Sequence, residues 1–302
     1  MAESKRVKTT VEGRQLSLSN LDKVMYPGDE RTKRDVIDYY TKISGVLLPQ
    51  LADRAITRIR YPDGVDNGSF YEKNAPRHTP DWVRTARIAT PGSSRGHDHL
   101  DFVVAEDVPT LVWLSNLAAL ELHAFGWKVT TENREPDRLV ADLDPGEGAG
   151  WVDCVEVALL LRDRLAEDGL VAYPKSSGKK GLHLTCPIAA EQTDTEVSAY
   201  ARAVAYEMQD RHPDLIVAKM RKVLREGKVF IDWSQNNAAK TTVSAYSLRN
   251  RSSATVSTPM TWDEVEAETP GTFTPEEVLE RIDELGDLYA DVLVTGPRVP
   301  EE

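Results

Sequence analysis

Apolar residues recur at helical spacing in several stretches of the chain. Between about Thr32 and Leu48, one face of a helix would carry Val36, Ile37, Tyr40, Ile43 and Leu47. A long apolar segment predicts a second helix at about 108–125, centred on residues 111–122. Three more helices are predicted at about 152–167, 195–211 and 275–287.

Shorter stretches have the pattern of strands. Residues 55–61 alternate in polarity and end at the turn sequence Pro62-Asp63-Gly64. Residues 138–144 form a short apolar run before Pro145-Gly146, and further strands are predicted at 171–174, 182–185 and 229–233. Residues 62–98 are rich in Gly, Pro, Asn and Ser and predict loops with short strands. This mixture predicts an α/β or α+β fold around a mixed sheet.

The negative charge of the chain is concentrated at its C-terminal end. The 302 residues include 37 Lys and Arg against 49 Asp and Glu, a formal net charge of −12. As an average, this charge argues against a nucleic-acid partner, because polyanions are bound by positive fields. Residues 262–302, however, contain thirteen acidic and two basic residues, so this segment carries −11 and the other 261 residues sum to −1. The local distribution of charge therefore matters more than the total.

Composition excludes several classes of protein. With 40% apolar and 28% charged residues the chain is typical of a globular domain. No run approaches the roughly 18 apolar residues that span a bilayer, so no membrane partner is expected. The N-terminus lacks an apolar signal region, and we expect a cytoplasmic, nucleoid-associated protein. Cys154 and Cys186 form no CxxC pair, which argues against a disulfide framework or a zinc knuckle.

Asp142 and Asp144 are the most informative pair of acidic residues. At positions i and i+2 of a strand, both side chains project from one face, while Leu143 points the other way. Two carboxylates held so close repel each other unless a cation lies between them, and Mg²⁺ or Mn²⁺ prefers such oxygen ligands. The alternative is that an Asp-x-Asp sequence before Pro-Gly only begins a turn.

Asp232 favours the metal interpretation. It lies in the strand 229–233, whose other residues are too apolar for an incidental acidic side chain. A buried carboxylate without a partner is destabilising by several kcal/mol, and a cation removes that penalty. Three aspartates could hold the two metal ions, roughly 3.5–4 Å apart, of an in-line phosphoryl displacement.

The turn at residues 175–181 has the composition of an anion-binding loop. Its sequence, Lys-Ser-Ser-Gly-Lys-Lys-Gly, contains no acid, and its glycines let backbone N–H groups approach an anion. It lacks the GxxxxGK[ST] spacing of a P-loop, and most turns of this kind are simply solvated. His183 on the next strand could reach the same ligand, although a lone histidine in a strand is more often a satisfied core residue.

Basic residues gather in two segments. Residues 219–251 contain eight basic and two acidic residues, which is the charge that a triphosphate or a phosphodiester backbone requires. Residues 5–34 contain eight basic and four acidic residues. Phe70 and Tyr71, in a loop flanked by Lys73 and Arg77, suit stacking on an exposed base. The alternative is that these aromatic residues are anchored in the core.

Three of these motifs together resemble the sequence signatures of a known protein superfamily. They are Asp142-Leu143-Asp144-Pro145, the segment 177–184 (SGKKGLHL) and the segment 229–236 (VFIDWSQN). They are similar to the signatures of the archaeo-eukaryotic primase superfamily, and most similar to the polymerase domain of bacterial ATP-dependent DNA ligase D. The resemblance extends from residues 18–27 through 60–65 and 70–73 to Tyr246-Ser247-Leu248-Arg249 and the last helix, so it covers nearly the whole chain.

The resemblance implies the archaeo-eukaryotic primase fold in one catalytic domain, 1–302. Residues 1–135 would form an N-terminal lobe that binds the 5′-phosphate end of DNA. Residues 136–302 would form a catalytic lobe with an RNA-recognition-like sheet and the acidic segment, which is expected to face solvent away from the phosphate sites. The implied activity is template-dependent extension of a DNA 3′ end with NTPs or dNTPs, often with a preference for ribonucleotides.

The resemblance also implies a role for individual residues. Asp142, Asp144 and Asp232 would ligate two ions, Mn²⁺ or Mg²⁺. The incoming nucleotide would be held by Ser177, Lys180, His183, Lys240 and Arg249, with Gln235 and His123 near its base or sugar. Arg225 would lie on the loop that receives the primer terminus, Lys23 and Lys33 would bind the 5′-phosphate of a downstream strand, and Phe70 and Tyr71 would stack at the template–downstream junction.

Two residues depart from the family pattern. Lys179 stands where a small residue is frequent, and Ile59 stands where a basic residue is expected, which bears on nucleotide affinity and sugar selection. The 302 residues contain no ligase signature after the polymerase motifs, so the chain is expected to be either a free-standing polymerase that works with a separate DNA ligase and Ku, or an excised domain.

Three other functions are compatible with the same residues. A primase that starts chains de novo would need no primer, a non-catalytic module would only bridge DNA ends, and a metal-dependent nuclease would degrade DNA. The three aspartates together argue against the bridging module. Gap filling at 5′-phosphorylated ends or 3′ overhangs is the predicted function.

Overall fold

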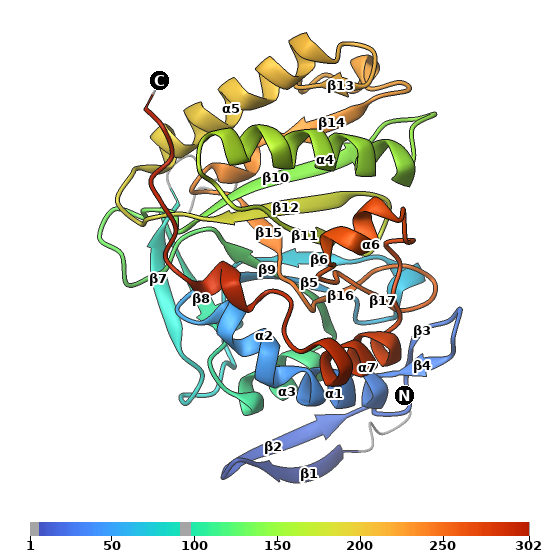
Figure 1. Cartoon of the computed structure of the whole chain (residues 1–302). Coiled ribbons are helices and arrows are strands. Elements are labelled where there is room, and N and C mark those ends of the chain that lie inside the picture. Colours follow the sequence, from blue (N-terminus) through green and yellow to red (C-terminus); the bar gives the residue numbers. More distant parts are fainter. Residues whose placement is uncertain (1–5, 91–97, 302) are drawn as a thin grey trace.

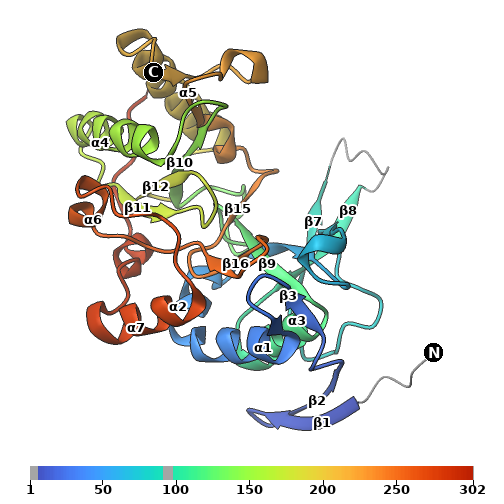
Figure 2. The ribbon, with the colours of Figure 1, turned by 90° about the vertical axis from the view of Figure 1, so that its right-hand side faces the viewer.

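A computed structural model describes residues 6–90 and 98–301, which fold around two β-sheets (Figure 1). The first sheet has the strand order β15-β9-β5-β8-β7, with β6 paired to β5. Its strands are β5 (Ala55–Arg60), β6 (Phe70–Glu72), β7 (Thr85–Ala89), β8 (His99–Val104), β9 (Ala119–Phe125) and β15 (Thr241–Val243). Helices α1 (Lys33–Lys42), α2 (Ser44–Leu51) and α3 (Val108–Asn116) lie on its outer side (Figures 1 and 2).

The second sheet contains the aspartate motifs. Its order is β11-β12-β10-β14-β13, antiparallel except for the parallel pair β13 and β14. The strands are β10 (Arg138–Pro145), β11 (Tyr173–Ser176), β12 (Leu182–Pro187), β13 (Ile216–Val217) and β14 (Val229–Asp232). Helices α4 (Trp151–Glu167) and α5 (Asp194–Arg211) cover one face, and the alternate residues of β10 on the other face are left to form a site.

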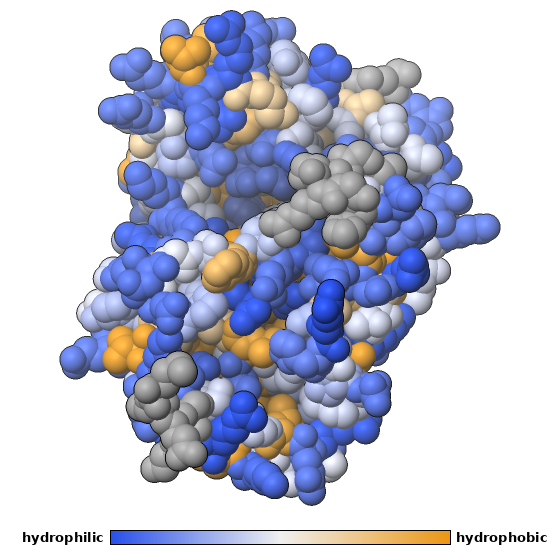
Figure 3. All heavy atoms as spheres, turned by 180° about the vertical axis from the view of Figure 1, so that it is seen from behind, coloured by the Kyte–Doolittle hydropathy of each residue, from blue (hydrophilic) through white to orange (hydrophobic). Residues whose placement is uncertain are grey.

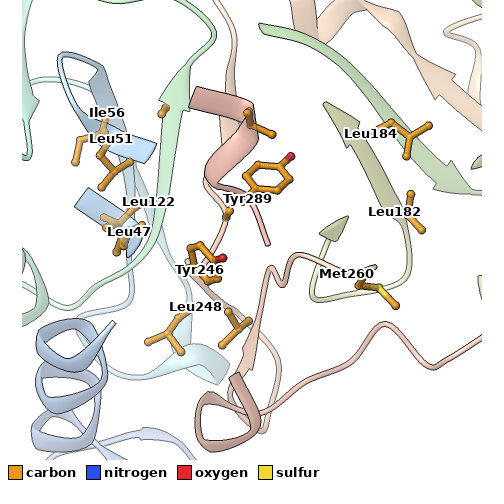
Figure 4. Packing of buried hydrophobic residues seen from close by; sticks show 14 of the residues in the cluster. Leu47, Leu51, Ile56, Leu122, Leu182, Leu184, Tyr246, Leu248, Met260 and Tyr289 are labelled. Carbon is orange, nitrogen blue, oxygen red and sulfur yellow. The ribbon is translucent and has the colours of Figure 1, made fainter. Parts of the chain in front are cut away.

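One hydrophobic cluster joins the two sheets (Figure 4). Leu47 of α2 and Ile56 of β5 lie at one end of the view, and Leu184 of β12 lies at the other. Tyr246 and Tyr289, both almost fully buried, lie between them. Because β15 also pairs with β9, the later part of the chain returns to the first sheet, and the relative position of the two sheets is fixed by packing. The division of the chain into lobes near residue 135 stays a prediction.

The acidic C-terminal segment is partly paired, in contrast to the expectation that it faces solvent. It contains α6 (Trp262–Glu266) and α7 (Pro275–Leu285), and the first turn of α7 contacts the segment just before α1. Arg31 donates to both carboxylate oxygens of Glu276, at 2.7 and 2.9 Å, and Arg281 pairs with Glu264. The phenol of Tyr246 donates to Asp287. Several of these acids therefore hold the segment on the body of the protein.

The smaller elements complete the fold. They are the hairpin of β1 (Arg6–Val11) and β2 (Arg14–Ser19), the pair β3 (Val24–Tyr26) and β4 (Arg31–Thr32), and the pair β16 (Leu248–Arg249) and β17 (Thr255–Val256). Short 3-10 helices occupy Val65–Asn67, Lys222–Leu224, Trp233–Asn236 and Ala290–Leu293. In the part of the chain that the structure describes, no helix combines the length and the apolar character needed to cross a bilayer.

The predicted helix at 108–125 is wrong in its second half. Helix α3 ends at Asn116, Ala118 has a left-handed backbone with φ of 58°, and β9 follows from Ala119. The apolar run hid an alternation, in which Glu121 and His123 occupy one face of the strand and Leu120 and Leu122 the other. The predicted helix at 32–48 is also two helices, and the strand predicted at 171–174 begins at Tyr173.

Candidate active site

The structure brings the three aspartates together on one sheet. Asp142 of β10 lies directly opposite Asp232 of β14 in the antiparallel register, and Asp144 follows two residues later on β10. The intervening Leu143 is fully buried, as expected for a residue that points to the opposite face. The strand assignment therefore confirms the spacing argument, and the turn-only interpretation of the Asp-x-Asp sequence is wrong, because β10 continues through both residues.

Polar side chains already contact Asp142 and Asp232. The amide Nε2 of Gln235 donates to Asp142 Oδ2 at 3.3 Å and to Asp232 Oδ2 at 3.2 Å. Lys240 Nζ lies 3.6 Å from Asp232 Oδ2, and the hydroxyl of Ser234 donates to Asp232. Gln235 thus bridges the two carboxylates from the 3-10 helix that follows β14.

The carboxylates of this cluster repel one another. Partial desolvation of the carboxylate raises the pKa of Asp144 to about 7, although the residue as a whole is exposed, and the negative charges of Asp142 and Asp232 are the next causes. Burial would also raise the pKa of Asp142, but the interaction with His183 outweighs it and the pKa is lowered. Arg225 and Arg249 act on Asp144 in the opposite sense to its acidic neighbours. These carboxylate oxygens are the ligands that divalent cations such as Mg²⁺ prefer, and a cation would relieve the repulsion between them.

The present side-chain positions do not by themselves enclose an ion. Among residues 6–90 and 98–301, no group of three or more His, Cys, Asp or Glu side chains forms a complete metal cluster. The oxygens of Asp142 and Asp232 are occupied by the hydrogen bonds from Gln235 and Ser234. Asp142 and Asp232 would hold an ion only after these hydrogen bonds are released.

A buried chain of polar groups continues from Asp142. His183 pairs with Asp142 across β10 and β12, and its Nε2 lies 3.2 Å from Asp142 Oδ1. On the other side of the ring, Lys175 Nζ lies 3.1 Å from His183 Nδ1 and donates to Ser257 Oγ at 2.7 Å. His183 and Lys175 are 5% and 3% exposed. The sequence identifies His183, whereas Lys175 is singled out only as part of the anion-binding turn 175–181 and not as a partner of His183.

Glu121 is a second residue that sequence reasoning missed. It is 1% exposed and accepts from Tyr61 at 3.2 Å and from the backbone N–H of Asn250 at 3.0 Å. Three cationic or ring nitrogens also face it, those of His123 at 3.0 Å, Arg249 at 3.1 Å and Lys179 at 3.8 Å.

The charge of Glu121 is stabilised by these neighbours. Burial alone would raise its pKa, but the hydrogen bond to His123 and the charge of Arg249 lower the pKa to about 2. Glu121 therefore fixes His123 and Arg249, two residues expected at the nucleotide. The alternation of Glu121 with His123 was the signal available in the sequence.

The Gly-rich turn between β11 and β12 is built around Ser177. The hydroxyl of Ser177 accepts from the backbone N–H groups of Lys179 at 3.2 Å and Gly181 at 3.1 Å. Gly178 has φ of 69°, and a Cβ there would lie 2.6 Å from Arg249. The turn thus lies against Arg249, while the Lys180 side chain is exposed at its tip.

Arg225 lies on the basic loop that precedes β14. Its guanidinium stacks 3.5 Å above the ring of Phe230 and donates to the carbonyl of Met220 at 2.9 Å. Gly146, just after the aspartate strand, packs so closely that a Cβ would lie 1.7 Å from the Arg225 carbonyl oxygen. The loop is thus held beside Asp144. The positive charge of Arg225 partly offsets the rise in the pKa of that carboxyl group.

The two lysines predicted to bind a 5′-phosphate differ in their surroundings. Lys23 is partly exposed, forms an ion pair with Asp63 at 2.6 Å and lines a surface pocket with Asn20 and Arg34. Lys33 is 5% exposed, and its ammonium donates to the carbonyls of Ser19 and Asn116 at 3.1 and 3.0 Å. Burial and the nearby Lys23 lower the pKa of Lys33.

Phe70 and Tyr71 are on the surface. Their side chains are 60% and 51% exposed on β6, so the alternative that they are anchored in the core is wrong. The phenol of Tyr71 lies 3.3 Å from the hydroxyl of Thr241, the residue after Lys240.

Hydrophilic residues dominate the face opposite to that of Figure 1, around a hollow in its upper part (Figure 3).

Together, the fold and the site define a mixed α/β protein with a carboxylate cluster on an antiparallel sheet, surrounded by cationic side chains. The family model of the LigD primase-polymerase domain matches residues 32–289. The chain belongs to this family.

Solved and curated relatives agree with this assignment. The polymerase domain of Mycobacterium tuberculosis ligase D, solved in complex with DNA, is 38% identical with a TM-score of 0.85, over 92% of this chain and 98% of that one. The multifunctional non-homologous end joining protein LigD of Mycolicibacterium smegmatis is 40% identical over 93% of this chain. The bifunctional LigD of Bacillus subtilis is 35% identical over 91%. The chain spans 36% and 44% of the lengths of these two relatives.

Proposed function

We propose that the protein adds nucleotides to the 3′ end of DNA during bacterial non-homologous end joining. The observation that carries this proposal is the cross-strand pair of Asp142 and Asp232, with Asp144 on the same face and Arg225, Lys240 and Arg249 around it. In the reaction, the primer 3′-oxygen attacks the α-phosphorus of a nucleoside triphosphate. The bond to pyrophosphate breaks, and the hydroxyl proton leaves to a nearby base.

The three aspartates fit two ions, Mn²⁺ or Mg²⁺. Their carboxylates are hard donors, and the raised pKa of Asp144 indicates negative charge that a cation would compensate. Bound there, the ions would lower the pKa of the primer hydroxyl and neutralise charge on the departing pyrophosphate.

The cationic and polar side chains around the aspartates would hold the triphosphate and the sugar. Ser177, Lys180, His183, Lys240 and Arg249 would contact the phosphates. Gln235 and His123 would lie near the base or sugar, and Arg225 would lie near the primer terminus. These residues come from seven separate segments of the chain. The proposal is supported by the contacts of Glu121, Asp142 and Asp232, which bring most of them together.

The N-terminal part would bind the downstream strand. Lys23 and Lys33 would hold its 5′-phosphate, and Phe70 and Tyr71 would stack on bases at the junction. The solved relative in complex with DNA supports a DNA partner. A separate DNA ligase and Ku would complete the repair, and a ribonucleotide preference would depend on the unusual residues Ile59 and Lys179.

The experiment is extension of a gapped duplex whose downstream strand has a 5′-phosphate. With Mn²⁺ and labelled NTPs or dNTPs, we expect template-directed addition to the primer and none without a primer. Products that form without a primer would instead indicate a de novo primase, and shortening of the primer would indicate a nuclease. A shift of labelled DNA without any extension would indicate an end-bridging module.

A further inference from the structure

Lys175 has no place in the function proposed above, yet it is among the most deeply buried charged residues of the protein. It lies on β11, opposite His183 in the antiparallel register with β12. Its side chain is 3% exposed, and its Nζ has two polar neighbours, His183 Nδ1 at 3.1 Å and Ser257 Oγ at 2.7 Å. No ion pair of Lys175 with an acidic side chain is found within 4 Å in the described residues.

Both neighbours of Lys175 act as hydrogen-bond acceptors. The hydroxyl of Ser257 donates to the carbonyl of Ser176 at 2.9 Å, so it meets Lys175 with a lone pair. An ammonium has only N–H donors and would donate to the ring of His183, whereas a neutral amine could also accept from a protonated Nδ1. The other nitrogen of the ring identifies Nδ1 as the acceptor of this contact.

The opposite nitrogen of the ring leads to the same assignment. His183 Nε2 lies 3.2 Å from Asp142 Oδ1, and an ionised carboxylate can only accept a hydrogen bond. When Nε2 donates to Asp142, the neutral ring presents a bare Nδ1, and the contact with Lys175 keeps the ring in that state. The two neighbours, on opposite sides of the imidazole, specify one tautomer and one ring orientation.

We propose that Lys175 is a positioning residue that fixes His183 with its Nε2–H directed at the aspartate site. This inference rests on the proposed function for its consequence, because the triphosphate, like Asp142, presents only acceptor oxygens. A ring that flips, or that moves its proton to Nδ1, would turn a lone pair toward those oxygens and lose the hydrogen bond. Ser257 holds the lysine in place from behind.

The direct test is the protonation state of each ring nitrogen of His183. Two-bond ¹H–¹⁵N NMR spectra of the ¹⁵N-labelled protein distinguish a protonated from a bare imidazole nitrogen. The chain has six histidines, and the signals that vanish in His183→Gln belong to this ring. In the wild-type protein we expect Nε2 protonated and Nδ1 bare at neutral pH, and a proton on Nδ1 would overturn the proposal.

Two variants test the part played by Lys175 itself. Lys175→Met removes the donor at similar length, and we expect mixed tautomer signals and about a tenfold rise in the KM for nucleoside triphosphate. Lys175→Gln keeps an N–H donor and should recover part of both effects. Lys128→Met, at a partly exposed lysine paired with Asp137, is the matched control and should change neither.

The outcomes separate this inference from the proposed function. An unchanged His183 tautomer together with an unchanged KM in Lys175→Met would overturn the positioning role. If Lys175→Met does not fold, as circular dichroism would show, the wild-type and Lys175→Gln spectra still decide the assignment. If no variant nor the wild-type protein extends DNA, the proposed function fails while the NMR result on His183 stands.

Discussion

Asp142 and Asp232 face each other across neighbouring antiparallel strands, and the side-chain amide of Gln235 joins them. Two long helices, α4 and α5, separate these aspartates in the sequence. Two negative charges at this distance repel each other. Gln235 donates to both carboxylates, and the His183 ring and the Lys240 ammonium lie beside their oxygens, so the pair is stabilised.

Glu121→Gln is expected to weaken nucleotide binding. The substitution removes the charge that pairs with Arg249 and His123, and we expect at least a tenfold rise in the KM for nucleoside triphosphate. Steady-state extension assays with varied nucleotide measure it. Glu207→Gln, at a surface acid that pairs with Arg164, is the control. An unchanged KM in Glu121→Gln would show that Glu121 does not hold these residues for the nucleotide.

Asp144→Asn is expected to stabilise the metal-free protein at high pH. Folding raises the pKa of Asp144 to about 7, so its contribution to stability is complete below about pH 4 and is lost as the pH rises through 7. The variant avoids this loss. Above pH 7 we expect the variant to be more stable than the wild-type protein by only about 1 kcal/mol, because solvent screens the repulsion at this exposed residue.

Urea unfolding in EDTA at several pH values measures this difference. The two proteins should coincide near pH 4, diverge as the pH rises from about 4 to 7, and keep a constant difference above pH 7. Addition of Mn²⁺ should stabilise the wild-type protein more than Asp144→Asn. Equal stability of the two proteins at pH 8 would contradict the repulsion between the aspartates.

Lys23→Met is expected to reduce the affinity for DNA with a 5′-phosphate and to lower the salt dependence by about one unit of log–log slope. Affinity for the same duplex with a 5′-hydroxyl should change little. Fluorescence anisotropy at several salt concentrations measures both. Lys42→Met, at an exposed lysine on α1 that pairs with Asp38, is the control. An equal loss of affinity for both duplexes would show that Lys23 does not recognise the 5′-phosphate.

Lys33→Met should act on stability as well as on DNA. The substitution leaves the carbonyls of Ser19 and Asn116 without their donor, at a cost of about 1–3 kcal/mol for each buried group. Thermal unfolding without DNA measures this effect, and Lys23→Met should not show it. A Lys33→Met protein with unchanged stability would contradict the buried position of this ammonium.

Replacement of Phe70 and Tyr71 by alanine should weaken binding to gapped DNA without loss of stability. Both rings are exposed, and stacking of a base on an aromatic side chain contributes about 1–3 kcal/mol. Binding to a gapped duplex, compared with thermal unfolding of the same variant, separates the two effects. A lower melting temperature with unchanged binding would give these rings a structural role instead.

The sequence predicts the aspartate strands because their signals are local. Asp142 and Asp144 alternate with a buried leucine, and Asp232 ends an apolar strand, so strand periodicity and the cost of a buried charge are sufficient. The predicted helix at 108–125 fails because the sequence 117–125 is apolar enough to hide a period of two. The break depends on the left-handed backbone of Ala118, which no turn residue marks.

Other features depend on contacts between distant segments. Glu121 pairs with Arg249 of β16 and with Lys179 of the turn between β11 and β12, and Lys175 contacts Ser257, which follows β17. No local pattern distinguishes Lys175 from an ordinary lysine, and the local signal at Glu121 is limited to its alternation with His123. The burial of Lys33 likewise comes from carbonyls on β2 and at the end of α3. These partners become visible only when the two sheets and their helices pack together.

The central claim is that Asp142, Asp144 and Asp232 form the centre that adds nucleotides to DNA. The most direct measurement compares the wild-type protein with Asp232→Ala on a gapped, 5′-phosphorylated duplex with Mn²⁺ and nucleoside triphosphates, and DNA binding is measured in parallel. We predict that Asp232→Ala abolishes extension and leaves DNA binding within about twofold of the wild-type value. Full extension by Asp232→Ala would contradict the claim.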